Sequence, residues 1–239
     1  MNVLQGSIRG GIGNLLNMCS SSSSTDIAII TDDGVYIYDN KDALLTGACL
    51  GPLTLTSIFN GYSGSGALPS ISDIIGLMVY QNNDIDMYNN FQVWRWQVQS
   101  GNLWSQSAQS FPKPMENLLG VSTGDLPPSN SDWCVNRDRN GRQDRFFYNG
   151  GLLYYFSTQN PTQDTFTPSA TDKYMNGYNL NPWTNLPAEP LVAVFSITSD
   201  SDDFVMITQS GELYQYQMDH VTNSNNPPIT STHLGTLVF

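Results

Sequence analysis

The chain has few charged side chains, and most of them are acidic. Charged residues make up 13% of its 239 residues, about half the usual share for a soluble domain. Nine basic residues against 21 acidic ones give a net charge of −12. Phosphate backbones and anionic membranes attract clustered Lys and Arg, whereas the arginines between residues 137 and 145 are interleaved with aspartates. The composition therefore argues against nucleic acid and anionic membrane surfaces as partners.

Paired cysteines, long apolar runs and a leader segment are missing as well. Cys19, Cys49 and Cys134 are odd in number and form no C-x-x-C pair, which argues against a disulfide framework and a zinc site. No stretch approaches the roughly 18 apolar residues of a membrane span. Residues 1–24 lack the basic segment and unbroken apolar run of a signal peptide. We expect no membrane insertion, and the Asn- and Ser-rich composition favours an extracellular or virion-surface location.

Residues that serve most catalytic mechanisms are also scarce. The chain has two histidines, His220 and His233, and no G-x-S-x-G motif. The paired carboxylates of a propeller glycosidase stay open as an alternative, because a sequence gives no distance between them. We predict that the protein is not an enzyme.

The chain does contain a repeat. Four strings with an apolar–aromatic–x–aromatic core begin 58, 60 and 60 residues apart, at residues 35, 93, 153 and 213: VYIY, VWRW, LYYF and LYQY. Period-two alternation puts both aromatics of each string on one face of a strand. We expect the aromatic pairs to fill the core: Tyr36 and Tyr38, Tyr154 and Phe156, Tyr214 and Tyr216. For Trp94 and Trp96 a second interpretation stays open, a surface shared with Trp104 and Trp133.

The same phase extends upstream of each string. Asp26, Asp84, Asp144 and Asp203 precede the first aromatic of each pair by 10, 10, 10 and 11 residues. Each Asp is followed by a short apolar run and then by a turn: TDDG, NNF, NGG or TQSG. An apolar strand, a polar turn and an aromatic strand make a β-hairpin. The sequence therefore predicts four hairpins in one phase.

These hairpins predict an all-β fold. No segment sustains a helical period, and the stretches between hairpins are rich in Pro, Gly, Ser and Asn. A period of about 60 residues fits a small β-propeller of four or five blades; a fifth blade would fall in residues 45–75 or 100–130. Residues 1–25 carry glycines and a five-serine run, which is typical of a flexible N-terminal arm. We assign the propeller-like domain to residues 26–239.

One stretch resembles a cation loop. The string NRDRNGRQD, residues 136–144, is similar to the D-x-[DN]-x-[DN]-G-x-x-D loop of FG-GAP/VCBS-type propeller repeats. The resemblance implies a structural calcium ion held by Asn136, Asp138, Asn140 and Asp144. Calcium takes six to eight oxygen ligands, so closely spaced Asp and Asn side chains suit it. The alternative is a solvated turn, which the same residues favour without a metal.

The count of four favours a second resemblance. Hemopexin-type propellers have four blades, each opened by an Asp and built from strands with Tyr-x-Phe patterns, and the chain resembles them in both respects. Both resemblances imply a propeller, and neither implies a particular function.

Tryptophans in polar segments are candidate ligand-binding residues. Trp104, Trp133 and Trp183 lie between or beside the hairpins, and an exposed indole ring stacks well on a sugar or a receptor. A rigid scaffold with such loops indicates a non-enzymatic recognition module that is lectin-like or receptor-binding. A virus or phage surface protein is one setting for such a module. Its partner would be a glycan or a cell-surface receptor. The alternative is a structural component of a virion or other large assembly, anchored to neighbouring subunits by its arm.

Overall fold

The computed structural model describes most of the repeat and its core. For some strand residues it describes the backbone alone. The described residues are 7–15, 26–48, 50–59, 68–79, 85–89, 91–99, 102–106, 111–119, 126–127, 131–139, 142–150, 152–158, 178–179, 186–197, 203–217 and 230–239.

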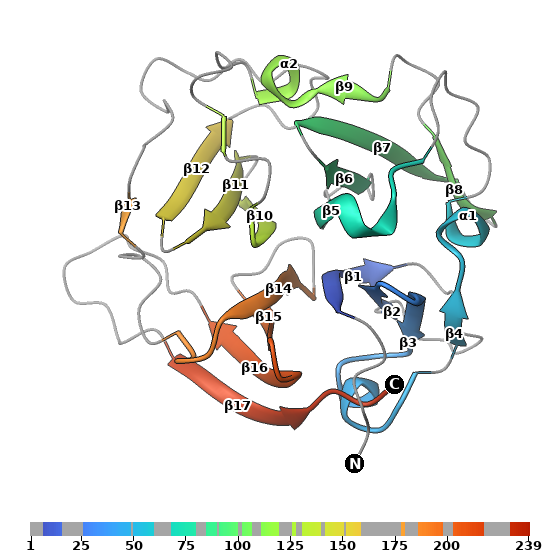
Figure 1. Cartoon of the computed structure of the whole chain (residues 1–239), viewed down its shortest axis with the longest axis vertical. Helices are drawn as coiled ribbons and strands as arrows, with labels where there is room; N and C mark the ends of the chain where they lie inside the picture. The colour runs from blue at the N-terminus through green and yellow to red at the C-terminus, as the bar shows by residue number, and fades with distance from the viewer. Residues whose placement is uncertain are drawn as a thin grey trace.

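The described strands form four antiparallel sheets arranged around a central axis (Figure 1). Blade I consists of β1 (Ile8–Leu15), β2 (Asp26–Thr31), β3 (Gly34–Tyr38) and β4 (Leu50–Leu53). Blade II consists of β5 (Ile74–Val79), β6 (Ile85–Asn89), β7 (Gln92–Gln99) and β8 (Asn102–Gln106), with the short β9 (Lys113–Pro114) paired to β7. Blade III consists of β10 (Trp133–Arg139), β11 (Arg142–Asn149), β12 (Leu152–Thr158) and β13 (Tyr178–Asn179). Blade IV consists of β14 (Leu191–Ser196), β15 (Asp203–Thr208), β16 (Glu212–Gln217) and β17 (Thr230–Thr236).

The first strand of each blade, β1, β5, β10 or β14, lies nearest the axis (Figure 1). The all-β propeller prediction is therefore confirmed, with four blades. Where a fifth blade was sought, the described residues instead belong to blades I and II or to short helices. Those helices are η1 (Asp42–Leu45), α1 (Leu55–Ile58), η2 (Ile71–Asp73) and α2 (Met115–Leu119). Among the described residues, no helix is both long and apolar enough to cross a membrane.

The four predicted hairpins share one register. They are β2–β3, β6–β7, β11–β12 and β15–β16, and the second aromatic of each pair lies opposite the residue after the repeated Asp: Ile27 with Tyr38, Ile85 with Trp96, Arg145 with Phe156, Phe204 with Tyr216. Asp84 lies outside the described residues. Because β15 and β16 are joined by three residues and the other hairpins by two, the spacing in blade IV is 11 instead of 10.

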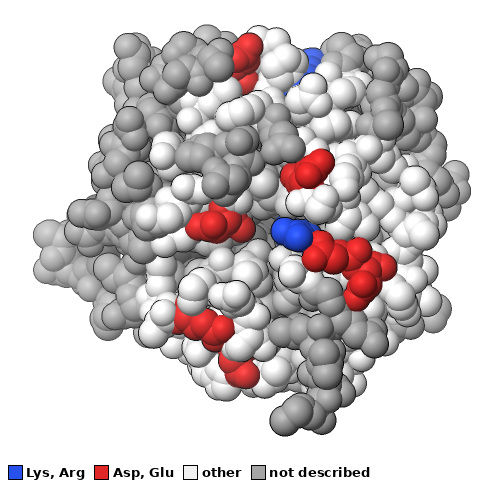
Figure 2. Space-filling model, in the orientation of Figure 1, with Lys and Arg blue, Asp and Glu red and all other residues white. Residues whose placement is uncertain are grey.

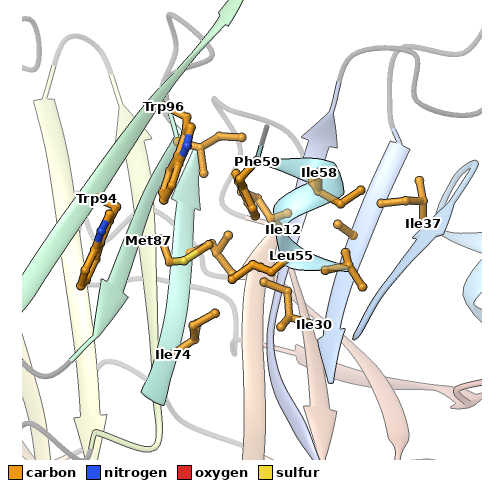
Figure 3. Packing of buried hydrophobic residues seen from close by; sticks show 14 residues of the cluster. Ile12, Ile30, Ile37, Leu55, Ile58, Phe59, Ile74, Met87, Trp94 and Trp96 are labelled. Carbon is orange, nitrogen blue, oxygen red and sulfur yellow. The ribbon is translucent and has the colours of Figure 1, made fainter. Parts of the chain in front are cut away.

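Side chains packed between neighbouring blades form the core. Figure 3 shows the boundary of blades I and II, where residues of β1, β2, β3 and α1 meet Met87 and Trp96. Six of the eight predicted aromatics are buried, and Tyr154 and Tyr214 are half-buried. Burying a large apolar side chain stabilises a fold by about 1.5–3 kcal/mol. The aromatic repeat therefore contributes to the packing between blades.

The boundary of blades II and III contains buried charge. Arg95 donates to both carboxylate oxygens of Asp86, with Nε–Oδ1 at 2.6 Å and Nη2–Oδ2 at 2.9 Å. The Nη2 atom of Arg145, from blade III, lies 3.6 Å from Asp86 Oδ2. The exposed side-chain fractions are 0% for Asp86, 8% for Arg95 and 0% for Arg145. This buried charge cluster links the two blades through ion pairing as well as apolar packing.

The predicted N-terminal arm is wrong over residues 8–15. These residues form β1, the inner strand of blade I, paired with β2. Their glycines allow close packing near the axis: a Cβ atom on Gly11 would collide with the ring of Phe195, and one on Gly13 would lie 2.5 Å from the Ser196 carbonyl oxygen. The propeller therefore includes residues 8–15, while residues 1–6 and 16–25 lie outside the described part of the chain.

The last residues of the chain join blade IV to blade I. The Val238 N–H donates to the Leu44 carbonyl at 2.9 Å, and the Tyr38 hydroxyl donates to the Val238 carbonyl at 3.0 Å. Leu237 is buried in the same cluster as Tyr38, and the Phe239 ring packs edge-on against Tyr36 at 4.7 Å. Ring closure therefore uses side-chain packing and backbone hydrogen bonds after β17.

Candidate functional site

The predicted calcium loop is a strand pair instead. Residues 136–139 and 142–144 belong to β10 and β11, with Asn136 opposite Arg145 and Arg137 opposite Asp144. Directly opposed residues share a face and neighbours alternate, so Asn136 and Asp144 point to opposite faces of blade III. The prediction of a loop in which both side chains bind one ion is therefore wrong. The side chain of Asp138 and the whole of Asn140 lie outside the described residues.

Asn136 and Asp144 are buried within the ring. The Asn136 side-chain amide donates to the Val79 carbonyl at 2.5 Å, which ties blade III to blade II. Asp144 is 1% exposed. Within the described part of the chain, no group of three or more His, Cys, Asp or Glu could hold a metal ion.

The predicted ligand-stacking tryptophan Trp133 is also a core residue. It is 1% exposed and stacks on Tyr148, with ring centroids 5.1 Å apart and planes 17° apart. As the first residue of β10, it points into the cluster between blades III and IV. Its use as a surface contact is therefore wrong. The Trp104 side chain and Trp183 lie outside the described residues, so their roles stay predictions.

One face of the ring carries the exposed polar side chains nearest the axis. We call it the turn face: it contains the starts of β1, β5, β10 and β14 and the turns of the four hairpins. Strand pairing brings these parts together, since Ile8 pairs with Thr31, Ile74 with Asn89 and Leu191 with Thr208. Figure 2 looks onto this face and shows several acidic side chains around its middle.

Each blade places a carboxylate at the start of its inner strand. Asp73 and Asp132 directly precede β5 and β10, and Glu189 stands two residues before β14. In blade I the carboxylate is Asp32 in the β2–β3 turn, which accepts a hydrogen bond from the Ser7 N–H at 3.3 Å. We call these four residues the carboxylate ring.

Three members of the carboxylate ring hold a hairpin turn against an inner strand. Asp32 accepts a hydrogen bond from Arg9 Nε at 2.7 Å, and Asp132 accepts one from the Gly150 N–H at 3.0 Å. Glu189 accepts hydrogen bonds from both the N–H and the hydroxyl of Ser210, each at 2.6 Å. The Arg9 hydrogen bond lowers the pKa of Asp32, and the Ser210 hydroxyl lowers the pKa of Glu189. Both carboxylates are therefore ionised at neutral pH.

The carboxylate ring is suited to binding hydrogen-bond donors. An ionised carboxylate offers about four lone-pair sites and donates nothing, so the lone pairs that the turns do not use remain available to hydroxyl or ammonium groups. Asp32, Asp73 and Asp132 are exposed, and Glu189 is half-buried. Anionic ligands are disfavoured here because four carboxylates lie on this face, and Arg9 is already paired with Asp32.

An exposed aromatic ring stands on the same face. Phe91, in the β6–β7 turn, is 41% exposed. The other exposed large apolar side chain among the described residues is Leu50, on the outer strand of blade I, at 43%. Phe91 therefore adds an aromatic surface at the end of blade II where Asp73 lies.

Comparison with known proteins supports the fold. No family model matches the chain, and no curated protein matches it. Among solved structures, a hemagglutinating plant albumin from Cicer arietinum is similar over 97% of this chain and 92% of its own, with a TM-score of 0.63 at 10% identity. The hemopexin fold protein CP4 from cow pea is similar over 96% and 92%, with a TM-score of 0.64 at 8% identity. A Cicer arietinum lectin described with two metal binding sites is similar over 94% and 93%, with a TM-score of 0.59 at 8% identity.

These likenesses decide between the two resemblances in the sequence. The chain has the four-bladed hemopexin-type propeller fold. The FG-GAP/VCBS resemblance depended on the loop at residues 136–144, which the β10–β11 register contradicts. The three proteins are from plants, so they lend no support to a virion or phage setting.

Sequence reasoning missed the carboxylate ring and Phe91, although both left signals. Asp73, Asp132 and Glu189 each stand just before an apolar run, in SDIIGL, SDWCV and AEPLV. Of the four hairpin turns, NNF is the one without glycine. Comparing the turns with one another would have singled out Phe91.

Proposed function

We propose that the protein is a non-enzymatic, lectin-like recognition module that binds a glycan on its turn face. The observation that carries this proposal is the carboxylate ring, three acidic side chains at the starts of inner strands and Asp32 in the β2–β3 turn, on the same face as the exposed Phe91. Carboxylates accept hydrogen bonds from sugar hydroxyls. Aromatic rings offer a flat apolar surface with little conformational entropy to lose. Hydroxyl acceptors next to such a surface suit a sugar better than an anion or an apolar ligand.

The fold is compatible with this function. Two structures of similar fold are described as a hemagglutinating albumin and a lectin. A likeness at 8–10% identity concerns the fold, so the ligand is inferred from the turn face of this chain. Rigid blades with binding groups at their turns are a common way to place recognition residues.

The described histidine has a partner that explains its position without catalysis. His233 Nε2 lies 2.6 Å from Glu212 Oε2 on the outer strands of blade IV. Glu212 also accepts the Thr236 hydroxyl at 2.9 Å. This cluster joins β16 to β17, so we infer a structural role for it. A glycan or glycan-bearing receptor as partner implies an extracellular place of action.

A glycan array tests the proposal. The wild type is compared with the double variant Asp73→Asn, Asp132→Asn, which removes two charges and keeps the side-chain shapes. Hydrogen bonds to charged groups contribute about 1.5–3 kcal/mol, so we expect affinity for the best glycan to fall at least tenfold. The matched control is Asp42→Asn, on η1 and outside the carboxylate ring, which should bind like the wild type.

Two results would contradict the proposal. One is a wild type that binds no glycan on the array. The other is a double variant that binds as tightly as the Asp42→Asn control. Self-association of the wild type in sedimentation, without glycan binding, would instead favour a structural component that contacts neighbouring subunits.

A further inference from the structure

The β6–β7 turn holds a bulky residue in a conformation that suits glycine. Asn89 pairs with Gln92, so residues 90 and 91 alone connect the two strands. Phe91 has a φ of 69°, and a bulky side chain in this left-handed region is a genuine outlier. Two-residue hairpin connections need positive φ values and usually contain glycine for that reason.

The other three hairpins each have a glycine with a positive φ at or beside the connection; in blade I it is Gly34, one residue after the position that corresponds to Phe91. Gly34, Gly150 and Gly211 lie at or beside the corresponding connections and have φ values of 145°, 54° and 87°. The hairpin of this fold is therefore compatible with glycine. Blade II departs from the other blades at a position where the departure strains its backbone.

The strained turn is held from outside the hairpin. The Met115 N–H, at the start of α2, donates to the Phe91 carbonyl at 2.6 Å. Met115 is buried, as are Leu118 and Leu119 in the same helix. The helix therefore fixes the backbone of residue 91 while leaving its ring 41% exposed. Strain that surrounding structure maintains is characteristic of binding sites.

Exposed polar residues lie at the same end of blade II as Phe91. Asp73 precedes Ile74, which pairs with Asn89, so the carboxylate lies at the same end of blade II as the turn. Ser70, Ser72 and Gln92 are exposed as well. A protein partner of apolar character would need a contiguous apolar patch, whereas a single ring among hydroxyls and a carboxylate suits a sugar, with an apolar C–H face and a polar rim.

We propose that Phe91 is a stacking residue that covers the C–H face of a pyranose ring while Asp73 accepts hydrogen bonds from its hydroxyls. This proposal rests on the proposed glycan-binding function and deepens it. It also explains why the positive φ of the blade II turn falls on a bulky Phe, whereas the described positive φ values at the other turns fall on glycine: the ring contributes to binding and not to folding.

The test separates stability from binding in one set of variants. Phe91→Gly removes both the strain and the ring, Phe91→Trp keeps an aromatic ring, and Leu50→Ala removes the other exposed apolar side chain as a control. We expect Phe91→Gly to raise Tm by a few degrees because the left-handed residue no longer carries a side chain. Its affinity for the best array glycan should fall at least tenfold. Phe91→Trp and Leu50→Ala should bind within about threefold of the wild type, since the first keeps a stacking surface.

The outcomes distinguish this inference from the function beneath it. A Phe91→Gly variant that binds like the wild type overturns the stacking role and leaves glycan binding intact. A Phe91→Gly variant with a lowered Tm shows that the ring supports folding, which also overturns the inference. A wild type without any glycan signal overturns both proposals.

Discussion

At the residue scale, the pair of Arg9 and Asp32 fixes the start of β1 to the β2–β3 turn. The two side chains make two hydrogen bonds, Nε–Oδ1 at 2.7 Å and Nη2–Oδ2 at 3.2 Å. Their side chains are 34% and 36% exposed, so solvent screens the pair. Its contribution to stability is therefore small, and its pH dependence is more informative than its size.

We predict that acid weakens this contact. Arg9 lowers the folded-state pKa of Asp32 below its ordinary value of 3.8, so near that value the unfolded state binds more protons than the folded state. The stabilisation is present above the unfolded pKa and is lost as pH falls through the folded one. Urea unfolding between about pH 5 and pH 2 should show a shallower loss of stability for Asp32→Asn than for the wild type. Equal slopes for the two proteins at low salt would contradict this assignment.

At the element scale, one blade boundary departs from its neighbour in chemistry. Where blade I presents Ala28 and Ile37, blade II presents Asp86 and Arg95 at the same register positions. On the facing blade, the residue at the equivalent register position is Ile85 at the boundary of blades I and II, and Arg145 at the boundary of blades II and III. The residues at the apolar boundary of blades I and II therefore show which side chains could replace the charged ones at the boundary of blades II and III.

This equivalence gives a prediction in two parts. Removing one partner, as in Asp86→Asn, should destabilise the protein by about 3–5 kcal/mol because two buried arginines lose their carboxylate. Copying the first boundary completely, with Asp86→Ala, Arg95→Ile and Arg145→Ile, should restore stability to the wild-type level or raise it, because desolvation offsets most of the gain from a buried ion pair.

Chemical denaturation of both variants checks the prediction. A triple variant as unstable as Asp86→Asn would show that the charged cluster itself stabilises the boundary. An Asp86→Asn variant of wild-type stability would show that the arginines find other acceptors.

Elements also show which patterns predict structure and which do not. The 60-residue phase predicted all four hairpins, because alternating aromatics and a turn constrain register strongly. Glycines at residues 10, 11 and 13 are ambiguous, since they suit both a flexible arm and close strand contact. The neighbouring strands β5 and β14 decide between these. Likewise, Asp and Asn in NRDRNGRQD suit both a cation loop and a pair of strands, and the pairing of β10 with β11 decides between these. The carboxylate ring combines residues from four blades, so it could not be predicted without knowing how the blades are arranged around the axis.

At the scale of the whole molecule, the ring is closed by the residues after β17. Leu237 is 3% exposed and lies in the cluster formed by blades I and IV. Its N–H donates to the Gly211 carbonyl at 2.9 Å, and Val238 continues onto η1 of blade I. In a closed ring each blade has two neighbours, so a blade that unfolds removes two blade boundaries. This closure should therefore govern the cooperativity of unfolding.

We predict that Leu237→Ala lowers the free energy of unfolding by about 2–5 kcal/mol, the usual range for truncating a buried leucine. Because the tail joins the first blade to the last, hydrogen exchange should accelerate in β2 and β3 as well as in β15 and β16, although residue 237 belongs to none of them. The matched control is Leu234→Ala, a half-buried leucine on β17, whose effect should be smaller. Accelerated exchange confined to blade IV would mean that blade I folds independently of the closure, and the ring would then be a row of blades held by pairwise contacts.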